Sequence, residues 1–389
     1  MKLLHTADWH AGRSLKGADR TPEVRDALLE IAEVAKTEAV DAVLVAGDVF
    51  DKRNPPANAE AAVYDFFLSL AERDIPSIVI AGNHDAPSRL DALSGLLSKV
   101  GARVLGDVKV ARAGGAFSLH LAGDTLQVAA LPFISERRLV RMADMLDADP
   151  GQWRRRYQEG MKALVKNLSQ DFAADAVNLL MMHTTMEGAT LAHSEYQFYC
   201  TEDYTVMTDI IPDMCNYVAL GHIHKPQPIK DYAGQGGRYC GSLLQLDFGE
   251  AGDTKSVFII DAKPGRPTEL VKQYDITSGK NLRQFRVTYE ELERRMKEIE
   301  SFDGYAKLVV NMERPLPGLK DRLRREAPNV LDVAVVLPER PQEEITGVDF
   351  RQTSMIDAFD QYYQEQRGTP LDDDMRQAFN ELYEDVSAR

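Results

Sequence analysis

The sequence predicts an α/β fold with a layered sheet and helices on its faces, followed by a small α+β domain and C-terminal helices. Three observations predict it. The chain has 389 residues, enough for a sizeable core and for more than one domain. Short apolar segments alternate with helical patterns through its first half. The pattern then changes after the turn residues Thr277-Ser278-Gly279.

The first part of the chain is expected to form the layered sheet and to end near Tyr274. Short apolar runs indicate its strands, and amphipathic patterns indicate its helices. The expected strands lie in KLLHTADWH, VDAVLVAGDVF and PSIVIAGNHD, and at Phe117–Leu121, Leu126–Leu131, Val177–His183, Tyr217–Gly221 and Val257–Asp261. The expected helices lie around Glu23–Lys36, Ala57–Glu72, Glu136–Leu146 and Gln152–Leu168.

The second part is expected to be a small α+β domain, a linker and two amphipathic helices. The domain has strands at Gln284–Val287, Ala306–Asn311 and Val330–Leu337, with helices at Tyr289–Ser301 and Gly318–Arg325. The linker is Pro338–Glu344. One terminal helix carries Phe350, Met355, Phe359 and Tyr362 or Tyr363, and the other carries Met375, Phe379, Leu382, Tyr383 and Val386. A phosphate loop of the type G-x-x-x-x-G-K-[ST] is missing from the sequence, so we expect no ATP hydrolysis.

The charge of the chain limits how it can bind nucleic acid. The formal net charge is −15, which argues against indiscriminate binding over the whole surface. The charge is uneven, since the segment from Pro341 to Arg389 holds twelve acidic residues and four arginines. The rest of the chain is only mildly acidic, so a local track for nucleic acid remains compatible with the sequence.

Cysteine use and hydropathy indicate a cytoplasmic protein. The three cysteines, Cys200, Cys215 and Cys240, have no metal-ligand spacing, and we expect them to be reduced, largely structural thiols. The N-terminal segment MKLLHTADWH has no extended apolar core, so we expect no signal peptide. We also expect no membrane span, because the sequence has no apolar run of sufficient length.

Metal-capable side chains gather where the expected strands end. The motifs are Asp8-Trp9-His10, Gly47-Asp48-Val49-Phe50-Asp51, Gly82-Asn83-His84-Asp85, His183 and Gly221-His222-Ile223-His224. In an open α/β sheet, ligands bind outside the carboxyl ends of the strands, so we expect these five ends to converge. The glycines before three of the motifs are expected to let the backbone turn sharply.

The motifs together predict a metal site, although some are weak alone. A single D-x-H is more often a turn, and G-D at a strand end is mostly structural. G-N-H-D and G-H-x-H are more informative, and the ordered set favours metal binding. Ligands from Asp, Asn and His without thiolate suit manganese or iron better than zinc or magnesium. Their number exceeds the need of one ion, so we expect two ions bridged by a carboxylate, with His222 and His224 on different ions.

The ordered motifs resemble those of the calcineurin-like metallophosphoesterase superfamily. The spellings HTADWHAG, VAGDVFD, AGNHD, ALGHIH and YCGS resemble the SbcD family within it, bacterial relatives of the double-strand-break repair nuclease that work with an SbcC-type ATPase. The motifs extend from Asp8 to His224, and similar spelling continues to Ser242. The resemblance implies a metallophosphoesterase β-sandwich flanked by helices, a small α+β capping domain and C-terminal helices that bind the partner.

The resemblance also implies a role for each site residue. One ion, expected to be Mn²⁺ like the second, would be held by Asp8, His10, Asp48 and His224. The second would be held by Asp48, Asn83, His183 and His222. His84 would face the substrate and stabilise the transition state or protonate the leaving 3′-oxygen.

Two further acidic residues are expected beside the ligands. Asp51 stands where archaeal and eukaryotic relatives tend to have histidine, so a catalytic role of that histidine does not transfer, and Asp51 is expected to support the site. Asp85 would either orient His84 or cap the following helix, and the sequence does not separate these alternatives.

The implied organisation is a nuclease domain at 1–275, a capping domain at 280–338, and a linker with partner-binding helices at 339–389. The implied function is DNA cleavage, as 3′–5′ exonuclease and endonuclease on ends or hairpins, in repair and recombination. A small-molecule or cyclic-nucleotide phosphodiesterase is the alternative. An inactive scaffold is disfavoured, because every ligand is present. The expected partners are DNA, an SbcC-type ATPase and a second copy of the chain, in a heterotetramer whose dimer contact involves helices near Pro55–Tyr64 and Arg89–Leu97.

Overall fold

The computed structural model describes residues 1–135, 138–139, 150–192, 194–195, 205–230, 236–266, 268–338, 354–367 and 371–387. The chain divides into two compact units, Met1–Val336 and Leu337–Arg389. Most of the expected helix around Glu136–Leu146 and of the expected linker lies outside the described residues, as do Cys200 and Phe350.

The first unit contains two six-stranded sheets, and the first has the order β16-β15-β1-β4-β5-β6. Its parallel strands are β1 (Lys2–Thr6), β4 (Ala42–Ala46), β5 (Ser77–Ile80) and β6 (Ala102–Leu105). The antiparallel strands are β15 (Ser256–Asp261) and β16 (Glu269–Asp275). Parallel neighbours need crossover connections, supplied here by α1 (Thr21–Thr37), α2 (Ala57–Ala71) and α3 (Pro87–Leu97). Strand β6 was not expected, because the exposed Arg103 interrupts its short apolar run.

The second sheet has the order β13-β14-β12-β9-β8-β7. Its strands are β7 (Ala116–Leu121), β8 (Asp124–Leu131), β9 (Val177–His183), β12 (Tyr217–Gly221), β13 (Gln227–Pro228) and β14 (Gly237–Tyr239). Strands β8, β9, β12 and β14 run parallel, and β7 and β13 are antiparallel edge strands. Two short pairs lie outside the main sheets, β2 (Ser14–Leu15) with β3 (Ala18–Asp19) and β10 (Thr185–Met186) with β11 (Thr205–Val206).

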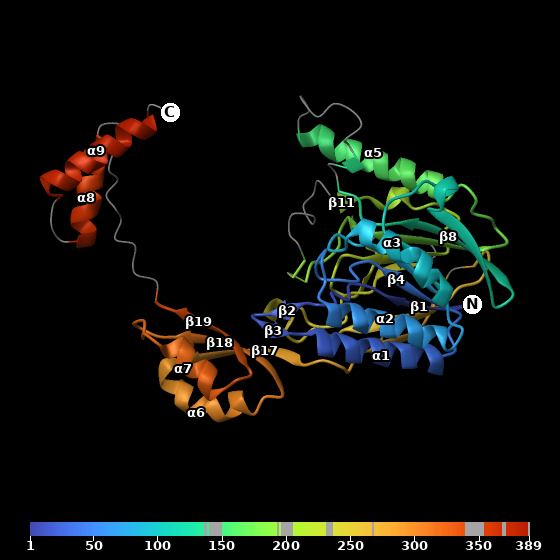
Figure 1. Ribbon diagram of the computed structural model, residues 1–389, viewed down its shortest axis with the longest axis horizontal. Helices are drawn as coiled ribbons and strands as arrows, with labels where there is room; N and C mark the ends of the chain where they lie inside the picture. Colours follow the sequence, from blue (N-terminus) through green and yellow to red (C-terminus); the bar gives the residue numbers. More distant parts are fainter. Residues whose placement is uncertain are drawn as a thin grey trace. The chain divides into compact units, whose positions relative to one another are not determined.

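The two sheets pack face to face, and helices cover their outer faces (Figure 1). Alternation along β4 sends Leu44 into the core between the sheets, where Met181 of β9 also lies. Its neighbour Val43 joins the core beneath α1 and α2. On the second sheet, α5 (Pro150–Leu168) buries Val165 against the outer face. The expected helix-flanked β-sandwich is confirmed.

A parallel three-stranded sheet with two helices follows in the same unit. Its elements are β17 (Asn281–Thr288), α6 (Tyr289–Glu300), β18 (Gly304–Asn311), α7 (Leu319–Glu326) and β19 (Val330–Val336), as expected from the sequence. Helix α6 begins with a capping box, in which the Thr288 hydroxyl and the Glu291 carboxylate each bind a main-chain N–H of the other residue. The apolar faces of these elements form a core of their own.

The second unit contains the two expected terminal helices, α8 (Met355–Arg367) and α9 (Asp373–Ser387). They pack on each other through Phe359 and Phe379, whose rings stack with centroids 4.5 Å apart. Arg376 of α9 pairs with Asp360 of α8. Met355 and Tyr362 remain exposed, at 50% and 59%. Among the described residues, every helix is too short or too polar to cross a membrane.

Candidate metal centre

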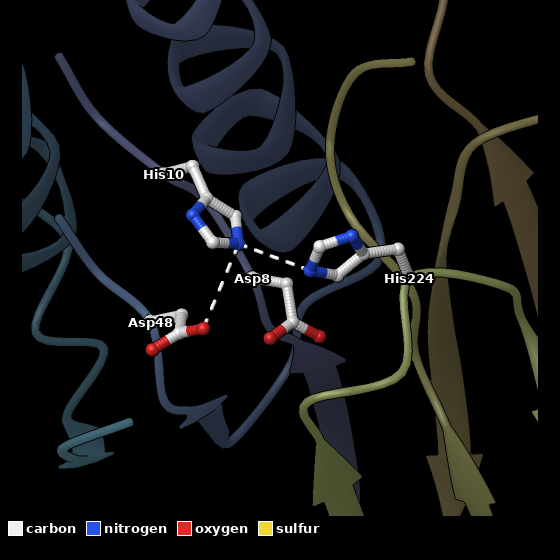
Figure 2. A group of neighbouring side chains, drawn as sticks. All are labelled: Asp8, His10, Asp48 and His224. Atoms are coloured by element: carbon white, nitrogen blue, oxygen red, sulfur yellow. Dashed lines mark hydrogen bonds and ion pairs between the residues drawn. The ribbon is translucent and has the colours of Figure 1, made fainter. Parts of the chain in front are cut away.

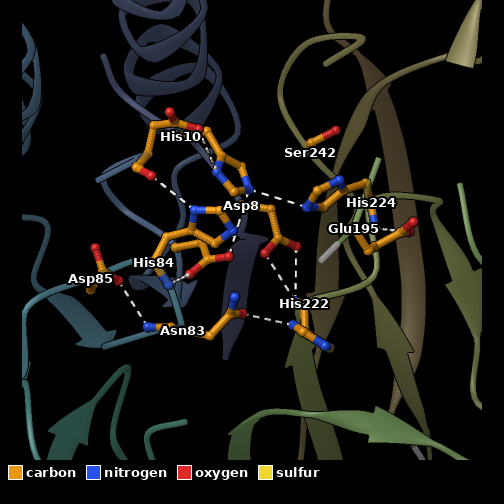
Figure 3. A network of polar contacts seen from close by, with 12 residues as sticks. Asp8, His10, Asn83, His84, Asp85, Glu195, His222, His224 and Ser242 are labelled. Carbon is orange, nitrogen blue, oxygen red and sulfur yellow. Dashed lines mark hydrogen bonds and ion pairs between the residues drawn. The ribbon is translucent and has the colours of Figure 1, made fainter. Parts of the chain in front are cut away.

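The predicted site residues come from the ends of strands in both sheets. Asp8 and His10 follow β1, Asp48 follows β4, and Asn83 and His84 follow β5. From the second sheet, His183 ends β9, and His222 and His224 follow β12. Figure 3 shows side chains from both sheets, among them His10, Asn83 and His224, gathered around Asp8. The convergence therefore arises between two packed sheets and not at the edge of one open sheet.

Four buried side chains form the first half of the centre. Asp8, His10, Asp48 and His224 each offer a ligand atom, and these atoms all lie within 4.8 Å of one another (Figure 2). Nε2 of His10 is 3.1 Å from Nε2 of His224 and 3.6 Å from an oxygen of Asp48. Buried imidazole nitrogens that face each other beside carboxylates fit a shared cation. The four residues are those that the resemblance assigns to one ion.

The second half of the centre is built around Asn83. Its side-chain oxygen is 2.8 Å from Nδ1 of His222 and 3.0 Å from Nε2 of His183. The Oδ2 atom of Asp48 is 3.5 Å from Nε2 of His183 and 3.6 Å from Nε2 of His10. Because one oxygen of Asp48 lies between the two halves, this carboxylate is placed where a bridging ligand is needed.

Four residues of the centre have a strained main chain. Positive φ angles occur at Asp8 (50°), His10 (47°), Asp48 (48°) and His222 (92°), a region that side chains other than glycine seldom adopt. Two main-chain hydrogen bonds of 3.0 Å hold these turns. The nitrogen of Asp8 donates to the main-chain oxygen of Gly47, and the nitrogen of His10 donates to the main-chain oxygen of Asp48. Such strain persists only where surrounding contacts enforce it, and it is typical of functional sites.

The three glycines before the motifs serve two different purposes. Gly47 has a φ of 97°, so the expected sharp turn is present there. Gly82 and Gly221 are required for space. A Cβ on Gly82 would lie 2.0 Å from Oδ1 of Asp48, and one on Gly221 would lie 2.0 Å from the oxygen of Ala46. All three glycines were expected to allow a sharp turn. For Gly82 and Gly221 that reason was wrong, because neither has a positive φ.

Polar groups behind the ligands set the orientation of two imidazoles. Nδ1 of His183 donates to the oxygen of Ala46 at 2.8 Å, which leaves Nε2 facing the centre. Nδ1 of His10 lies 3.4 Å from Oδ1 of Asp51, whose same oxygen is 3.0 Å from Arg13. Asp51 thus contacts a predicted ligand from the outside, where a supporting residue would lie.

Asp85 has neither of the two roles considered for it. Its buried carboxylate accepts main-chain N–H bonds from Gly82 at 2.8 Å, Phe50 at 2.9 Å and Val49 at 3.2 Å. Helix α3 begins after Ala86 without a side-chain cap, and the imidazole of His84 bonds to Asp51 instead. The Asp85 carboxylate therefore ties together the loops that follow β4 and β5.

His84 is half-buried and is anchored at two points. Its main-chain nitrogen donates to Oδ1 of Asp48 at 2.9 Å, and its Nδ1 donates to the main-chain oxygen of Asp51 at 2.8 Å. Its ring centroid is 4.7 Å from that of His10. With Nδ1 engaged, Nε2 is the ring nitrogen that can serve a substrate.

Burial and mutual charge shift the pKa values in the centre. Burial raises the pKa of Asp8 to about 7. Burial would raise the pKa of Asp48 too, but the charge and hydrogen bond of His183 outweigh it and hold that pKa well below its usual value. Burial works against a charged His183, yet the Asp48 carboxylate raises its pKa to about 9. Burial lowers the pKa of His10 to about 4, which keeps its ring neutral and able to ligate.

The sequence did not reveal the side chains behind His224. Oε1 of Glu195 accepts the main-chain N–H of His224 at 3.0 Å, and Glu250 and Ser194 lie on the Nδ1 side of its ring. The chain has 61 acidic residues, and nothing in the local sequence pattern distinguishes Glu195 and Glu250 from the others.

Known proteins are similar to this chain over most of its length. Residues 1–226 match the family model described as calcineurin-like phosphoesterase. The chain is 34% identical over 393 residues to the SbcD subunit of the nuclease SbcCD from Bacillus subtilis, covering 98% of this chain and 97% of that protein. The SbcD subunits from Rhodobacter capsulatus and Escherichia coli are 34% and 31% identical over 280 and 283 residues, covering 68% of this chain and 67% and 66% of theirs.

Proposed function

Because the chain belongs to the calcineurin-like phosphoesterase family and, within it, to the SbcD subunits of the SbcCD nuclease, we propose that it cleaves DNA as such a subunit. The chain is a metal-dependent hydrolase. The observation that carries the proposal is the position of Asp48, with one oxygen 3.6 Å from His10 and 3.5 Å from His183. A carboxylate between two sets of donors suits the hydrolysis of a phosphodiester.

We propose that two divalent ions, Mn²⁺ in the cell, bind in this centre. One would take Asp8, His10, Asp48 and His224, and the other Asp48, Asn83, His183 and His222. The donors are carboxylate and amide oxygens with imidazole nitrogens, a set that suits manganese. The hydrogen bond from His183 to Ala46 supports the assignment, because it directs Nε2 to the centre.

The surrounding residues position the substrate and the leaving group. Divalent cations in such a centre lower the pKa of a water and offset the charge that grows on the phosphoryl oxygens. His84, anchored by its Nδ1 to the main-chain oxygen of Asp51, would present Nε2 to a phosphoryl oxygen or to the leaving 3′-oxygen. Asp85 holds the loops that carry Asp48 and His84 in register.

We propose that the chain is organised into a nuclease domain, a capping domain and a segment that binds a partner. Residues 1–275 would form the nuclease domain, 280–338 the capping domain, and 339–389 the segment that binds an SbcC-type ATPase. The exposed Met355 and Tyr362 support partner binding through α8, since apolar anchors on one helix suit a groove in a partner. The net charge of −15 fits a subunit whose grip on DNA comes mainly from that ATPase.

A second copy of the chain and a cytoplasmic location complete the proposal. Leu68 on α2 and Leu96 on α3 are 50% and 69% exposed, which supports a dimer contact through these helices within a heterotetramer. Cys215 and Cys240 are buried free thiols, as suits a reducing compartment.

The test is Mn²⁺-dependent hydrolysis by the purified protein, with and without the ATPase. Linear DNA, bis-p-nitrophenyl phosphate and cyclic nucleotides are compared as substrates. The variant Asp48→Asn should lose about 100-fold or more of the activity. Asp209→Asn is the matched control, because Asp209 is exposed and pairs with Lys162 away from the centre.

Each substrate pattern has a defined meaning. DNA degradation that disappears in Asp48→Asn and persists in Asp209→Asn supports the nuclease. Turnover of the small esters with DNA left intact, even beside the ATPase, would support a small-molecule phosphodiesterase. Absence of hydrolysis on every substrate would support a scaffold.

A further inference from the structure

A buried polar network lies behind His224. It consists of Ser194, Glu195, Glu250 and Lys255, and we call it the Glu250 network. Glu250 is fully buried, and Lys255 and Glu195 are 5% and 6% exposed. Buried charges are costly unless they are paired and hydrogen-bonded, so each contact in the network needs a physical reason.

The two oxygens of Glu250 have different partners. Oε2 lies 2.6 Å from Nζ of Lys255 and accepts the main-chain N–H of Leu246 at 3.0 Å. Oε1 accepts the hydroxyl proton of Ser194 and lies 3.7 Å from Nδ1 of His224. Nζ of Lys255 also donates to the main-chain oxygen of His224 at 3.0 Å. The ion pair therefore holds His224 by its ring and by its main chain.

These contacts determine the tautomer of His224. An ionised carboxylate can only accept, so the single hydroxyl proton of Ser194 goes to Glu250. The hydroxyl oxygen then accepts from Nδ1 of His224, 2.5 Å away. With its proton on Nδ1, the ring directs the lone pair of Nε2 toward His10, whose Nε2 is 3.1 Å distant. This is the ring state that a metal ligand needs.

We propose that Glu250 is a positioning residue for His224, with Ser194 as the link between them and Lys255 as the counter-charge. The inference rests on the proposed metal assignment and deepens it. Stability alone is a weak reason for the network, because a buried ion pair often contributes little net free energy of folding. Partners behind a metal-ligating histidine, in contrast, change metal affinity by about 10- to 100-fold.

The network also connects His224 to the α+β region. Glu250 ends the short 3₁₀ turn η6 (Phe248–Glu250). The oxygen of Phe248 accepts from Nε2 of Gln284 in β17 at 2.8 Å, and the Phe248 ring packs against Leu282 of the same strand. The turn that carries Glu250 is thus packed against β17.

Metal binding measured directly tests the role of Glu250. Mn²⁺ titration calorimetry gives the number of ions and the affinity of each, and the visible spectrum of the Co²⁺-substituted protein reports the ligand geometry. The variants are Glu250→Gln, Ser194→Ala and Ser194→Thr. Glu23→Gln is the matched control, since Glu23 forms a largely buried pair with Arg20, at 2.6 Å, that contacts no proposed metal ligand.

The expected result is selective. Glu250→Gln and Ser194→Ala should lower the affinity for one of the two Mn²⁺ ions by about 10- to 100-fold. Both variants should also alter the Co²⁺ spectrum. Ser194→Thr keeps a hydroxyl, so its Mn²⁺ affinity and Co²⁺ spectrum should be those of the unmodified protein. The control Glu23→Gln should also leave the affinity and the spectrum unchanged. If Glu250→Gln does not fold, Ser194→Ala decides, because it leaves the Glu250–Lys255 pair intact.

Two outcomes would overturn the inference in different ways. Two ions bound with unchanged affinity and spectrum in Ser194→Ala would exclude a positioning role while leaving the proposed function in place. An unmodified protein that binds no Mn²⁺ would reject the proposed function itself, and this inference with it.

Discussion

The main-chain nitrogen of His222 donates to the carboxylate of Asp8, at 2.9 and 3.1 Å from its two oxygens. The two residues are 214 positions apart and follow strands of different sheets, β12 and β1. Both residues have positive φ angles, so this hydrogen bond joins two strained segments that directly follow strands. The two halves of the proposed metal centre are thus held together by the packing of one sheet on the other.

Replacement of His84 should separate catalysis from metal binding. The proposed ligands do not include His84, and its ring is anchored to Asp51 through Nδ1. We expect His84→Gln to lower kcat by about 10²- to 10⁴-fold, the range of a general acid, with both Mn²⁺ ions retained. Activity on DNA and calorimetric Mn²⁺ titration check this. Loss of an ion in the variant would show that His84 is a ligand.

The close approach at Gly82 should make it intolerant of a side chain. A Cβ there would lie 2.0 Å from Oδ1 and 2.3 Å from the nitrogen of Asp48. We expect Gly82→Ala to lower the free energy of unfolding by about 1–3 kcal/mol and Mn²⁺ affinity by at least about tenfold.

The matched control for Gly82 is Gly95, exposed in α3 with nothing within 4 Å of an added Cβ. Gly95→Ala should leave Mn²⁺ binding unchanged and raise stability by about 0.5–1 kcal/mol. Thermal denaturation and Mn²⁺ titration measure both effects. Equal behaviour of the two variants would contradict the steric role of Gly82.

Mn²⁺ binding should release protons and weaken as the pH falls. In the metal-free centre the pKa of His183 is raised to about 9, mainly by Asp48 acting against burial, so at neutral pH its ring is charged. It must lose a proton to ligate. Burial raises the pKa of Asp8 to about 7, so below that pH a second proton must leave. Raised pKa values favour the protonated, metal-free state at low pH, so affinity should increase as the pH rises toward about 9.

Calorimetry in buffers of different ionisation enthalpy counts these protons. We expect at least about one proton released per protein between about pH 7 and pH 9, from His183, and a larger number below pH 7 as Asp8 also becomes protonated. Affinity should change about tenfold per pH unit for each proton released. Mn²⁺ affinity that is constant over this range, without proton release, would contradict the assignment of His183 and Asp8 as ligands.

Removal of the terminal helices should abolish partner binding alone. The proposed centre lies wholly in the first unit, so a chain ending at Pro338 should hydrolyse bis-p-nitrophenyl phosphate at an unchanged rate. The same chain should no longer co-purify with an SbcC-type ATPase. Normal co-purification would show that the partner binds elsewhere.

A single substitution in the full chain sharpens the test of the tail. Tyr362 is 59% exposed on α8, and Tyr362→Ser should weaken ATPase binding by about 1 kcal/mol or more, as for an interface anchor. Tyr289→Ser is the matched control, since Tyr289 is 36% exposed at the start of α6. Affinity measured for both variants identifies whether α8 contacts the partner.

Local pattern was sufficient to predict most elements and the motifs at their ends. Alternating or continuous apolar runs identified β1, β4, β5, β9 and β12, because burial on both sides of a parallel strand leaves an unmistakable apolar segment. The metal-capable residues directly after these strands were visible for the same reason. The strand β6 was missed, since the exposed Arg103 breaks the apolar run that made the equally short β5 visible.

By itself, the sequence determined which residue types end which strands, and hence the predicted donors of the centre. Only the tertiary structure decided that these ends belong to two facing sheets, that Gly82 leaves room for Asp48, and that Glu250 lies behind His224. The physical reason is that periodicity reports the burial of each residue in its own segment. Contacts such as that between Asp8 and His222 depend on how distant segments pack, which no local pattern records.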